Sequence, residues 1–360
     1  MTDLSAHAQQ TAKLTLWYTR CPVPSAAGIA IRKGWLDEEF NEQGISVRSL
    51  RASTDRSIRE SHFAHTQQNS FRQGGNAPAL WARSQGQDTV LLGLSWVEQY
   101  QGILTLPESG IESVAQLKGK RLALPQRLND QIDFWRSISL QGYANALSLA
   151  GLNLKDVSLV NIPITDTFIA PNEISDESGP LFTPYTLVRQ HTAELLALLR
   201  GEVDVIFGYS IWGAEIKAQF RAVEVTDLSR QSERNLRINN GQPKTLTVSG
   251  NLLRNQPELV ERYVAQLLRA AEWSAKYRNE ARRIVAQEVG SAEFWLDETA
   301  RGPLEDNLRI GLGSDLVAEL EIRKQFLLEH GFINDDFSLQ EWIDPGPLLA
   351  AQKLVSTQII

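Results

Sequence analysis

The chain has very little sulfur: of its 360 residues, Cys21 is the only cysteine and Met1 the only methionine. A single cysteine excludes an intrachain disulfide, and a single methionine leaves no thioether cluster for a soft metal. Positive charge is also in the minority, because 36 Lys and Arg stand against 43 Asp and Glu, giving a net charge of −7. Nucleic acids and anionic membranes are bound by basic surfaces, so we expect neither partner.

Long apolar runs are missing as well. No stretch approaches the roughly 18 consecutive apolar residues of a membrane-spanning helix. The first twenty residues lack a basic segment followed by an apolar one, so they do not resemble a secretory signal. We therefore expect a cytoplasmic protein, an expectation that a leader upstream of Met1 would reverse, and the net charge is compatible with a monomer. The composition that remains, 42% hydrophobic and 22% charged, is that of a globular chain with about two domains.

Strand and helix patterns alternate along the chain. A helical pattern at 25–36 lies between strand patterns at 13–18 and 44–50, which is typical of a parallel α/β unit. Similar alternation continues through strands predicted at 89–97, 121–125, 157–164, 203–208 and 246–250. We predict an α/β fold of two lobes: residues 1–122 and 241–360 form lobe 1, and residues 123–240 form lobe 2. Two crossing strands join the lobes, and a ligand cleft lies between them at the carboxyl ends of strands.

Cys21 lies where a predicted strand ends and a helix follows. The sequence Cys21-Pro22-Val23-Pro24 restricts the backbone and would hold the sulfur in one place. The helix dipole and the neighbouring Arg20 would both favour the thiolate. A lone cysteine is more often a buried, inert residue, and that alternative stays open here.

A second polar region contains His62, His65, Arg72, Gly74 and Gly75. The two histidines have helical spacing, but no third ligand completes a metal site, so we predict no metal. His62 is better suited to orient or deprotonate a thiol. Arg72 can hold a two-oxygen anion with its planar fork, and the two glycines let backbone amides approach that anion. A surface histidine and an ordinary Gly-Gly turn are the alternatives.

Several aromatic residues follow predicted strands or begin helices. Trp135, Phe207, Tyr209 and Trp212 are placed to line an apolar cleft, although most large rings pack in cores. We select Trp135 and Trp212 as substrate-binding candidates.

Longer segments resemble a known fold. LKGKRLALP at 117–125 and RGEVDVIFG at 200–208 are similar to segments of type II periplasmic binding proteins, especially the sulfonate- and nitrate-binding group. That resemblance covers most of the chain and implies the two-lobed fold. Taken alone, it implies a non-catalytic solute-binding protein of an ABC transporter for sulfonates or sulfinates. A cytoplasmic sensor, or an enzyme of the pyrimidine-synthesis type on this fold, is a third possibility.

Shorter motifs resemble the 2'-hydroxybiphenyl-2-sulfinate desulfinase family. They are Tyr18-x-x-Cys21-Pro22-Val23-Pro24, His62-Phe63, Arg72-x-Gly74-Gly75, and the segments 203–216 and 325–333. The resemblance implies a cytoplasmic hydrolase of carbon–sulfur bonds, with no metal or organic cofactor, that releases sulfite from an aryl sulfinate. Its active site would use a cysteine, a histidine, an arginine and a Gly-Gly backbone.

Carried onto this chain, the family pattern makes Cys21, His62 and Arg72 the candidate catalytic residues. Phe63, Gly74 and Gly75 join the two tryptophans as candidate substrate-binding residues. The only partner we expect is the small aryl sulfinate. Two chemical routes remain open, namely attack of the thiolate on sulfur and proton delivery from the thiol to the ring carbon.

Overall fold

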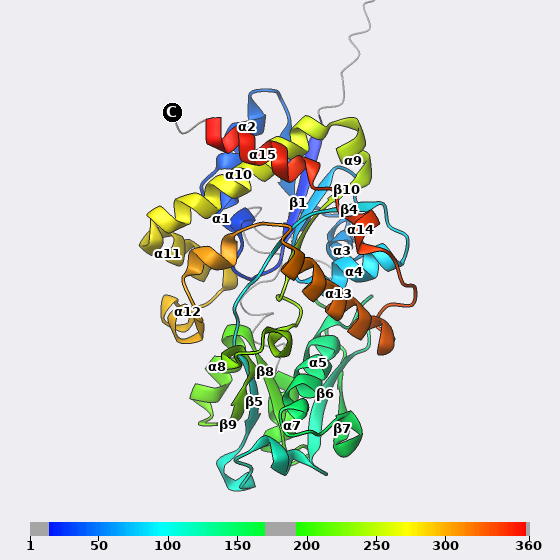
Figure 1. The fold of residues 1–360 in the computed structure, drawn as a ribbon, viewed down its shortest axis with the longest axis vertical. Helices are drawn as coiled ribbons and strands as arrows, with labels where there is room; N and C mark the ends of the chain where they lie inside the picture. The colour runs from blue at the N-terminus through cyan, green and yellow to red at the C-terminus, as the bar shows by residue number, and fades with distance from the viewer. Residues whose placement is uncertain (1–13, 170–191, 358–360) are drawn as a thin grey trace, which may run out of the picture.

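The computed structural model describes residues 14–169 and 192–357, which form two α/β lobes stacked along the long axis of the molecule (Figure 1). The upper lobe is built on a five-stranded sheet of order β2-β1-β3-β10-β4. The first three strands of that order are parallel, whereas β10 runs antiparallel to both of its neighbours. Its strands are β1 (Thr15–Arg20), β2 (Ser46–Ser49), β3 (Ser70–Gly74), β4 (Thr89–Ser95) and β10 (Lys244–Ser249).

Helices cover both faces of this sheet. Phe71 of β3 stacks on a tyrosine of the long helix α10, at 3.7 Å between ring centroids, and anchors the core of one face. The helices that pack there are α1 (Ala26–Arg32), α2 (Trp35–Asn41), α9 (Gly250–Asn255), α10 (Pro257–Lys276), α11 (Arg278–Val289), α12 (Glu293–Thr299) and α15 (Gly346–Thr357). On the other face pack α3 (Arg56–Ala64), α4 (Asn76–Ser84), α13 (Ser314–Glu329) and α14 (Leu339–Trp342).

The helix predicted at 25–36 is two helices. Gly34 adopts a left-handed conformation with φ of 75°, so α1 ends before it and α2 begins after it. A left-handed residue cannot continue an α-helix, and glycine adopts that conformation without steric cost.

The lower lobe holds a sheet of order β8-β5-β9 and the parallel pair β6-β7, joined by a bridge between Leu122 and Val205. Its elements are β5 (Gln101–Thr105), β6 (Arg121–Arg127), α5 (Phe134–Ser148), β7 (Ser158–Ile164), α7 (Thr192–Leu199), β8 (Ile206–Tyr209), α8 (Ser210–Gln219) and β9 (Val223–Asp227). β5 pairs with β8 and β9, so the chain crosses into the lower lobe before Gln101. The prediction placed residues 1–122 in lobe 1, so it assigned β5 to the upper lobe, whereas β5 pairs with the strands of the lower lobe.

The predicted α/β class and the binding-protein type of fold are confirmed. The chain passes from β4 down to β5 and returns from the lower lobe to β10 (Figure 1). Because β1 and β3 are neighbouring parallel strands, their carboxyl ends lie at the same edge of the upper sheet. Cys21 directly follows β1 and Gly75 directly follows β3, so both residues lie at that edge. Along the described ranges, no helix combines the length and the apolar character that crossing a membrane requires.

Candidate active site

Cys21 directly follows β1 and is half-buried. Its backbone N–H donates to the carbonyl of Gln73 at 3.1 Å, which extends the pairing of β1 with β3 by one residue. The Val23 N–H turns back to the carbonyl of Cys21 at 2.8 Å, and the side chain of Ser25 then caps α1. The Cys-Pro-Val-Pro turn is thus fixed at both ends, as the prolines predict.

Arg72 reaches Cys21 from the neighbouring strand. Its Nη2 lies 3.5 Å from the Cys21 sulfur, while Nε donates to the His62 carbonyl at 3.0 Å and Nη1 to the Gly75 carbonyl at 2.9 Å. The side chain is 2% exposed. Burial lowers the pKa of Arg72, and a charge on Cys21 opposes that shift. The guanidinium therefore places a buried positive charge beside the sulfur.

His62 approaches the same sulfur from α3. Its Nε2 lies 3.7 Å from the sulfur, and its Nδ1 lies 2.7 Å from the Thr19 hydroxyl oxygen. Burial, together with the charges of Arg72 and His65, holds the pKa of His62 well below its usual value. The imidazole is therefore neutral at physiological pH. In the tautomer whose Nδ1–H donates to Thr19, Nε2 faces the thiol as a proton acceptor.

Arg20 does not support Cys21, so that part of the sequence interpretation is wrong. Side chains alternate along a strand, and Arg20 points to the sheet face opposite Arg72. There it forms a buried ion pair with Glu288 of α11. Its charge is balanced by that carboxylate rather than by a thiolate.

His65 lies at the carboxyl end of α3, in a left-handed conformation, and burial and Arg72 lower its pKa. Neither ring nitrogen forms a hydrogen bond. It does not join the cluster around Cys21. Across the described residues, no group of three or more His, Cys, Asp or Glu is placed to hold a metal ion.

A narrow pocket opens in front of the Cys21 sulfur. It is lined by Cys21, Pro22, Val23, Gly75, Gln99, Phe134, Trp135, Ile138, Tyr209, Trp212, Asn240 and Gly241. The upper lobe contributes the thiol, and the lower lobe contributes the aromatic wall. Its volume is about 50 Å³, whereas ligand pockets usually hold roughly 300–1,000 Å³.

The structure brings most of the predicted substrate-binding residues to this pocket. Trp135 contacts Trp212 edge-on, at 6.1 Å between centroids, and both line it with Gly75. Phe63 does not line the pocket: it is 3% exposed and stacks behind Phe134 at 5.8 Å. Gly74 acts by contact with the sulfur, because a Cβ built there would lie 2.3 Å from it.

Sequence reasoning missed two polar residues that line the pocket, Asn240 and Gln99, and the buried Lys244 of β10. Asn240 accepts from the backbone N–H groups of Asn76, through its carbonyl at 2.7 Å, and of Ala77, through its side chain at 2.9 Å. The turn-forming sequence Asn-Asn-Gly-Gln-Pro was the available signal for it. Gln99 and Lys244 carried no local signal, since their positions depend on tertiary packing.

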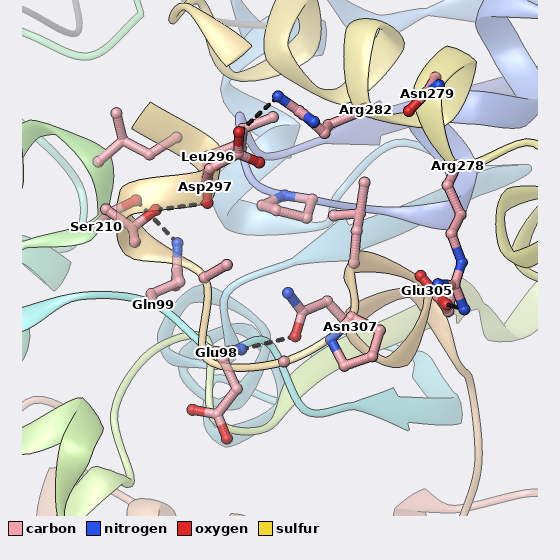
Figure 2. A pocket seen from close by; sticks show the side chains of 17 residues that line it. Glu98, Gln99, Ser210, Arg278, Asn279, Arg282, Leu296, Asp297, Glu305 and Asn307 are labelled. Carbon is pink, nitrogen blue, oxygen red and sulfur yellow. Dashed lines mark hydrogen bonds and ion pairs between the residues drawn. The ribbon is translucent and has the colours of Figure 1, made fainter. Parts of the chain in front are cut away.

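Figure 2 shows a second, larger cavity, whose volume is about 350 Å³ and which shares Gln99 with the Cys21 pocket. Gln99 lines both, and its side chain donates to Ser210 and accepts from Tyr209, each at 3.0 Å. The two arginines of the larger cavity are already paired: Arg278 with Glu305 at 2.6 Å, and Arg282 with Asp297 at 2.5 Å. A sulfinate would gain little from charges that are already compensated, so the Cys21 pocket is the better candidate.

The contact between Gly74 and the sulfur gives a testable prediction. Gly74→Ala adds a methyl group 2.3 Å from the Cys21 sulfur, so the thiol must move. We expect a displacement of that size at the thiol to lower turnover about a hundredfold, to be measured as kcat. Gly311→Ala is the control, because no atom lies within 4 Å of its new Cβ. Equal activity of the two variants would contradict the assigned place of the sulfur.

The sequence is similar to one family model and to two kinds of known protein. A family model described as NMT1/THI5 like matches residues 26–173. The 2'-hydroxybiphenyl-2-sulfinate desulfinase of Rhodococcus erythropolis is 28% identical over 352 residues, 92% of each chain. A putative aliphatic sulfonates-binding protein of Bacillus subtilis is 34% identical over 97 residues, 27% of this chain and 29% of its own.

Solved structures agree with these relationships. A mutant of the desulfinase DszB, with serine in place of a cysteine and in complex with biphenyl-2-sulfinic acid, superposes with a TM-score of 0.75. It is 25% identical, and the match covers 95% of this chain and 100% of that one. The periplasmic sulphonate-binding protein SsuA of Escherichia coli shares the fold at 14% identity and a TM-score of 0.65, over 92% of each chain. By sequence and by fold over nearly its whole length, this chain is similar to 2'-hydroxybiphenyl-2-sulfinate desulfinases, and it has the fold of type II periplasmic binding proteins.

Proposed function

We propose that this protein is a cysteine-dependent desulfinase that hydrolyses the carbon–sulfur bond of an aryl sulfinate resembling 2'-hydroxybiphenyl-2-sulfinate. The observation that carries the proposal is the placement of Cys21. Its sulfur faces an aromatic pocket and has the guanidinium of Arg72 at 3.5 Å and the imidazole of His62 at 3.7 Å. A thiol, a neutral base and a buried cation are the groups that this hydrolysis needs.

The overall reaction consumes one water. The carbon–sulfur bond breaks, the hydroxyl of water joins the sulfur, and the proton of water joins the ring carbon. The products are hydrogensulfite and an arene, which is a phenol when the substrate carries the 2'-hydroxyl. No oxidant or reductant is needed, since the pair of electrons of the broken bond stays with the carbon that takes the proton.

Cys21 can act by either of two routes. In the first, its thiolate attacks sulfur and expels the ring as a protonated arene, leaving a Cys–S–SO₂⁻ adduct that water hydrolyses to thiol and hydrogensulfite. In the second, the thiol gives its proton to the ring carbon, sulfur dioxide leaves, and water converts it to hydrogensulfite. His62 accepts the thiol proton in the first route and orients the thiol in the second. A trapped adduct with the mass of sulfur dioxide on Cys21 would identify the first.

Arg72 and the pocket hold the two ends of the substrate. Arg72 does not line the pocket itself, but its Nη2 lies 3.5 Å from the Cys21 sulfur, so its charge attracts a sulfinate bound at that sulfur. Phe134, Trp135 and Trp212 offer ring faces and edges to the aromatic part of the substrate. The crystal complex of the relative with biphenyl-2-sulfinic acid supports a ligand of this class.

A solute-binding protein for sulfonates or sulfinates is the second candidate, favoured by the likeness to sulfonate-binding proteins. A desulfinase releases sulfite from its ligand, whereas a solute-binding protein binds the ligand without changing it. We expect the protein, without added cofactor, to release sulfite from 2'-hydroxybiphenyl-2-sulfinate at a rate proportional to enzyme. Binding of this sulfinate, seen by calorimetry, without any sulfite would reject the desulfinase and favour the solute-binding function.

A further inference from the structure

Lys244 is a buried lysine that none of the steps above uses. It is the first residue of β10 and is 1% exposed. Its Nζ donates to the Pro24 carbonyl at 2.5 Å, and among the described residues it forms no ion pair with a carboxylate. Burying an ammonium group without a counter-ion costs free energy. Because burying this ammonium group lowers the stability of the fold, we expect Lys244 to have a function that offsets the cost.

The register of the sheet places Lys244 against the Cys21 turn. Leu246 of β10 pairs with Gln73 of β3, so the side chain of Lys244, two residues before Leu246, lies on the same sheet face as Gln73. Arg72 lies on the opposite face. The turn from Cys21 to Pro24 is therefore held from both faces: Arg72 contacts the sulfur, and Lys244 binds the carbonyl three residues later.

The titratable groups around Cys21 come from four elements in the described chain: Arg72 from β3, His62 from α3, Tyr209 from β8 and Lys244 from β10. Burial lowers the pKa of His62 and raises that of Tyr209, so both are neutral near pH 7. Burial also lowers the pKa of Lys244 to about 7, and a charge on Cys21 is the group that opposes this. Arg72 and the protonated form of Lys244 are thus the cations that can stabilise the thiolate, and a charged Cys21 in turn favours that protonated form.

We propose that Lys244 is a positioning residue for Cys21, whose buried ammonium group holds the Pro24 carbonyl and favours the thiolate form of Cys21 through its positive charge. The thiolate in turn is the missing counter-ion of Lys244. This inference deepens the proposed function, since it concerns the same thiol. Its test does not depend on that function, because it measures the thiol itself.

The test is the pH dependence of Cys21 alkylation by iodoacetamide, followed by mass spectrometry of the whole protein. Cys21 is the only cysteine, so one adduct reports one site. Removing a nearby positive charge raises a thiol pKa, so Lys244→Met should move the midpoint of alkylation upward by about one pH unit. At a pH below the midpoint, that shift slows the reaction about tenfold.

Two further variants separate charge from other effects. Lys244→Gln keeps a donor for the Pro24 carbonyl but has no charge, so it should show the same shift as Lys244→Met. Lys217→Met removes a lysine that pairs with Glu224 at 2.7 Å on the other lobe, and its midpoint should equal that of the wild type. Circular dichroism and thermal melting check that each variant folds.

An unchanged midpoint in Lys244→Met, or a wild-type midpoint in Lys244→Gln, would overturn the proposal. The first result would mean that Lys244 does not influence the thiol, and the second that the hydrogen bond alone suffices. A protein that releases no sulfite, yet shows the expected shift, would reject the desulfinase while leaving the coupling of Lys244 to Cys21 intact.

Discussion

Replacing Cys21 by serine should reduce sulfite release by about a thousandfold, while binding of the sulfinate stays within about threefold of the wild type. A serine hydroxyl ionises far less readily than a thiol, so it is a poor nucleophile in the first route. It is also a weaker acid, so it delivers a proton poorly in the second route. The smaller oxygen fits the space beside Gly74, where the thiol is in contact with the backbone. Steady-state sulfite release and isothermal calorimetry measure the two effects.

The two measurements have to be made on the same preparation. If Cys21→Ser keeps more than about a tenth of the wild-type kcat, the cysteine does not carry the chemistry in either route. Loss of binding together with turnover would instead point to a disturbed pocket. Ser25→Ala is a useful control, because Ser25 caps the helix that follows the same turn but does not contact the sulfur.

The alternation of strands and helices was readable from the sequence because most central strands are apolar runs that end at glycine or polar residues. β3, β5 and β9 are not among the strands that the sequence predicts. The sequence of β3, Ser-Phe-Arg-Gln-Gly, is polar, yet four of its five residues are buried at the centre of the upper sheet. A polar strand in that place is formed by its neighbours and by the hydrogen bonds of Arg72 and Gln73, which no local pattern contains.

The candidate site divides in the same way. Cys21, His62 and Arg72 could be selected because the motifs that contain them resemble those of the desulfinase family. The fold places the three residues within hydrogen-bonding distance of one another. The sequence analysis assigned Arg20 to the Cys21 thiolate, but Arg20 pairs with Glu288. Being adjacent to Cys21 in sequence does not determine the sheet face to which the Arg20 side chain points. Lys244 could not be selected from the sequence, because most lysines in folded proteins are exposed and only the tertiary structure shows that this one is buried.

Replacing Arg72 should weaken binding of the sulfinate selectively. In a Cys21→Ser background, which prevents turnover, Arg72→Met should raise the Kd of 2'-hydroxybiphenyl-2-sulfinate about thirtyfold or more, since a charge-assisted contact is lost from a buried site. The Kd of the uncharged product, 2-hydroxybiphenyl, should change by less than about threefold, because the aromatic wall belongs to the other lobe. Calorimetry with both ligands provides the comparison.

The comparison of the two ligands separates recognition of the anion from general damage. Arg72 also holds the carbonyls of His62 and Gly75, so its loss can disturb the site as a whole. A disturbed site would weaken both ligands together, whereas a lost anion contact weakens only the charged one. Arg72→Lys retains the charge without the fork, so it should fall between Arg72→Met and the parent. Arg83→Met serves as the control, because Arg83, near the end of α4, donates to the Thr89 carbonyl of β4 at 3.3 Å and does not contact the sulfur. Equal weakening of sulfinate and phenol would show that Arg72 shapes the pocket but does not select the anion.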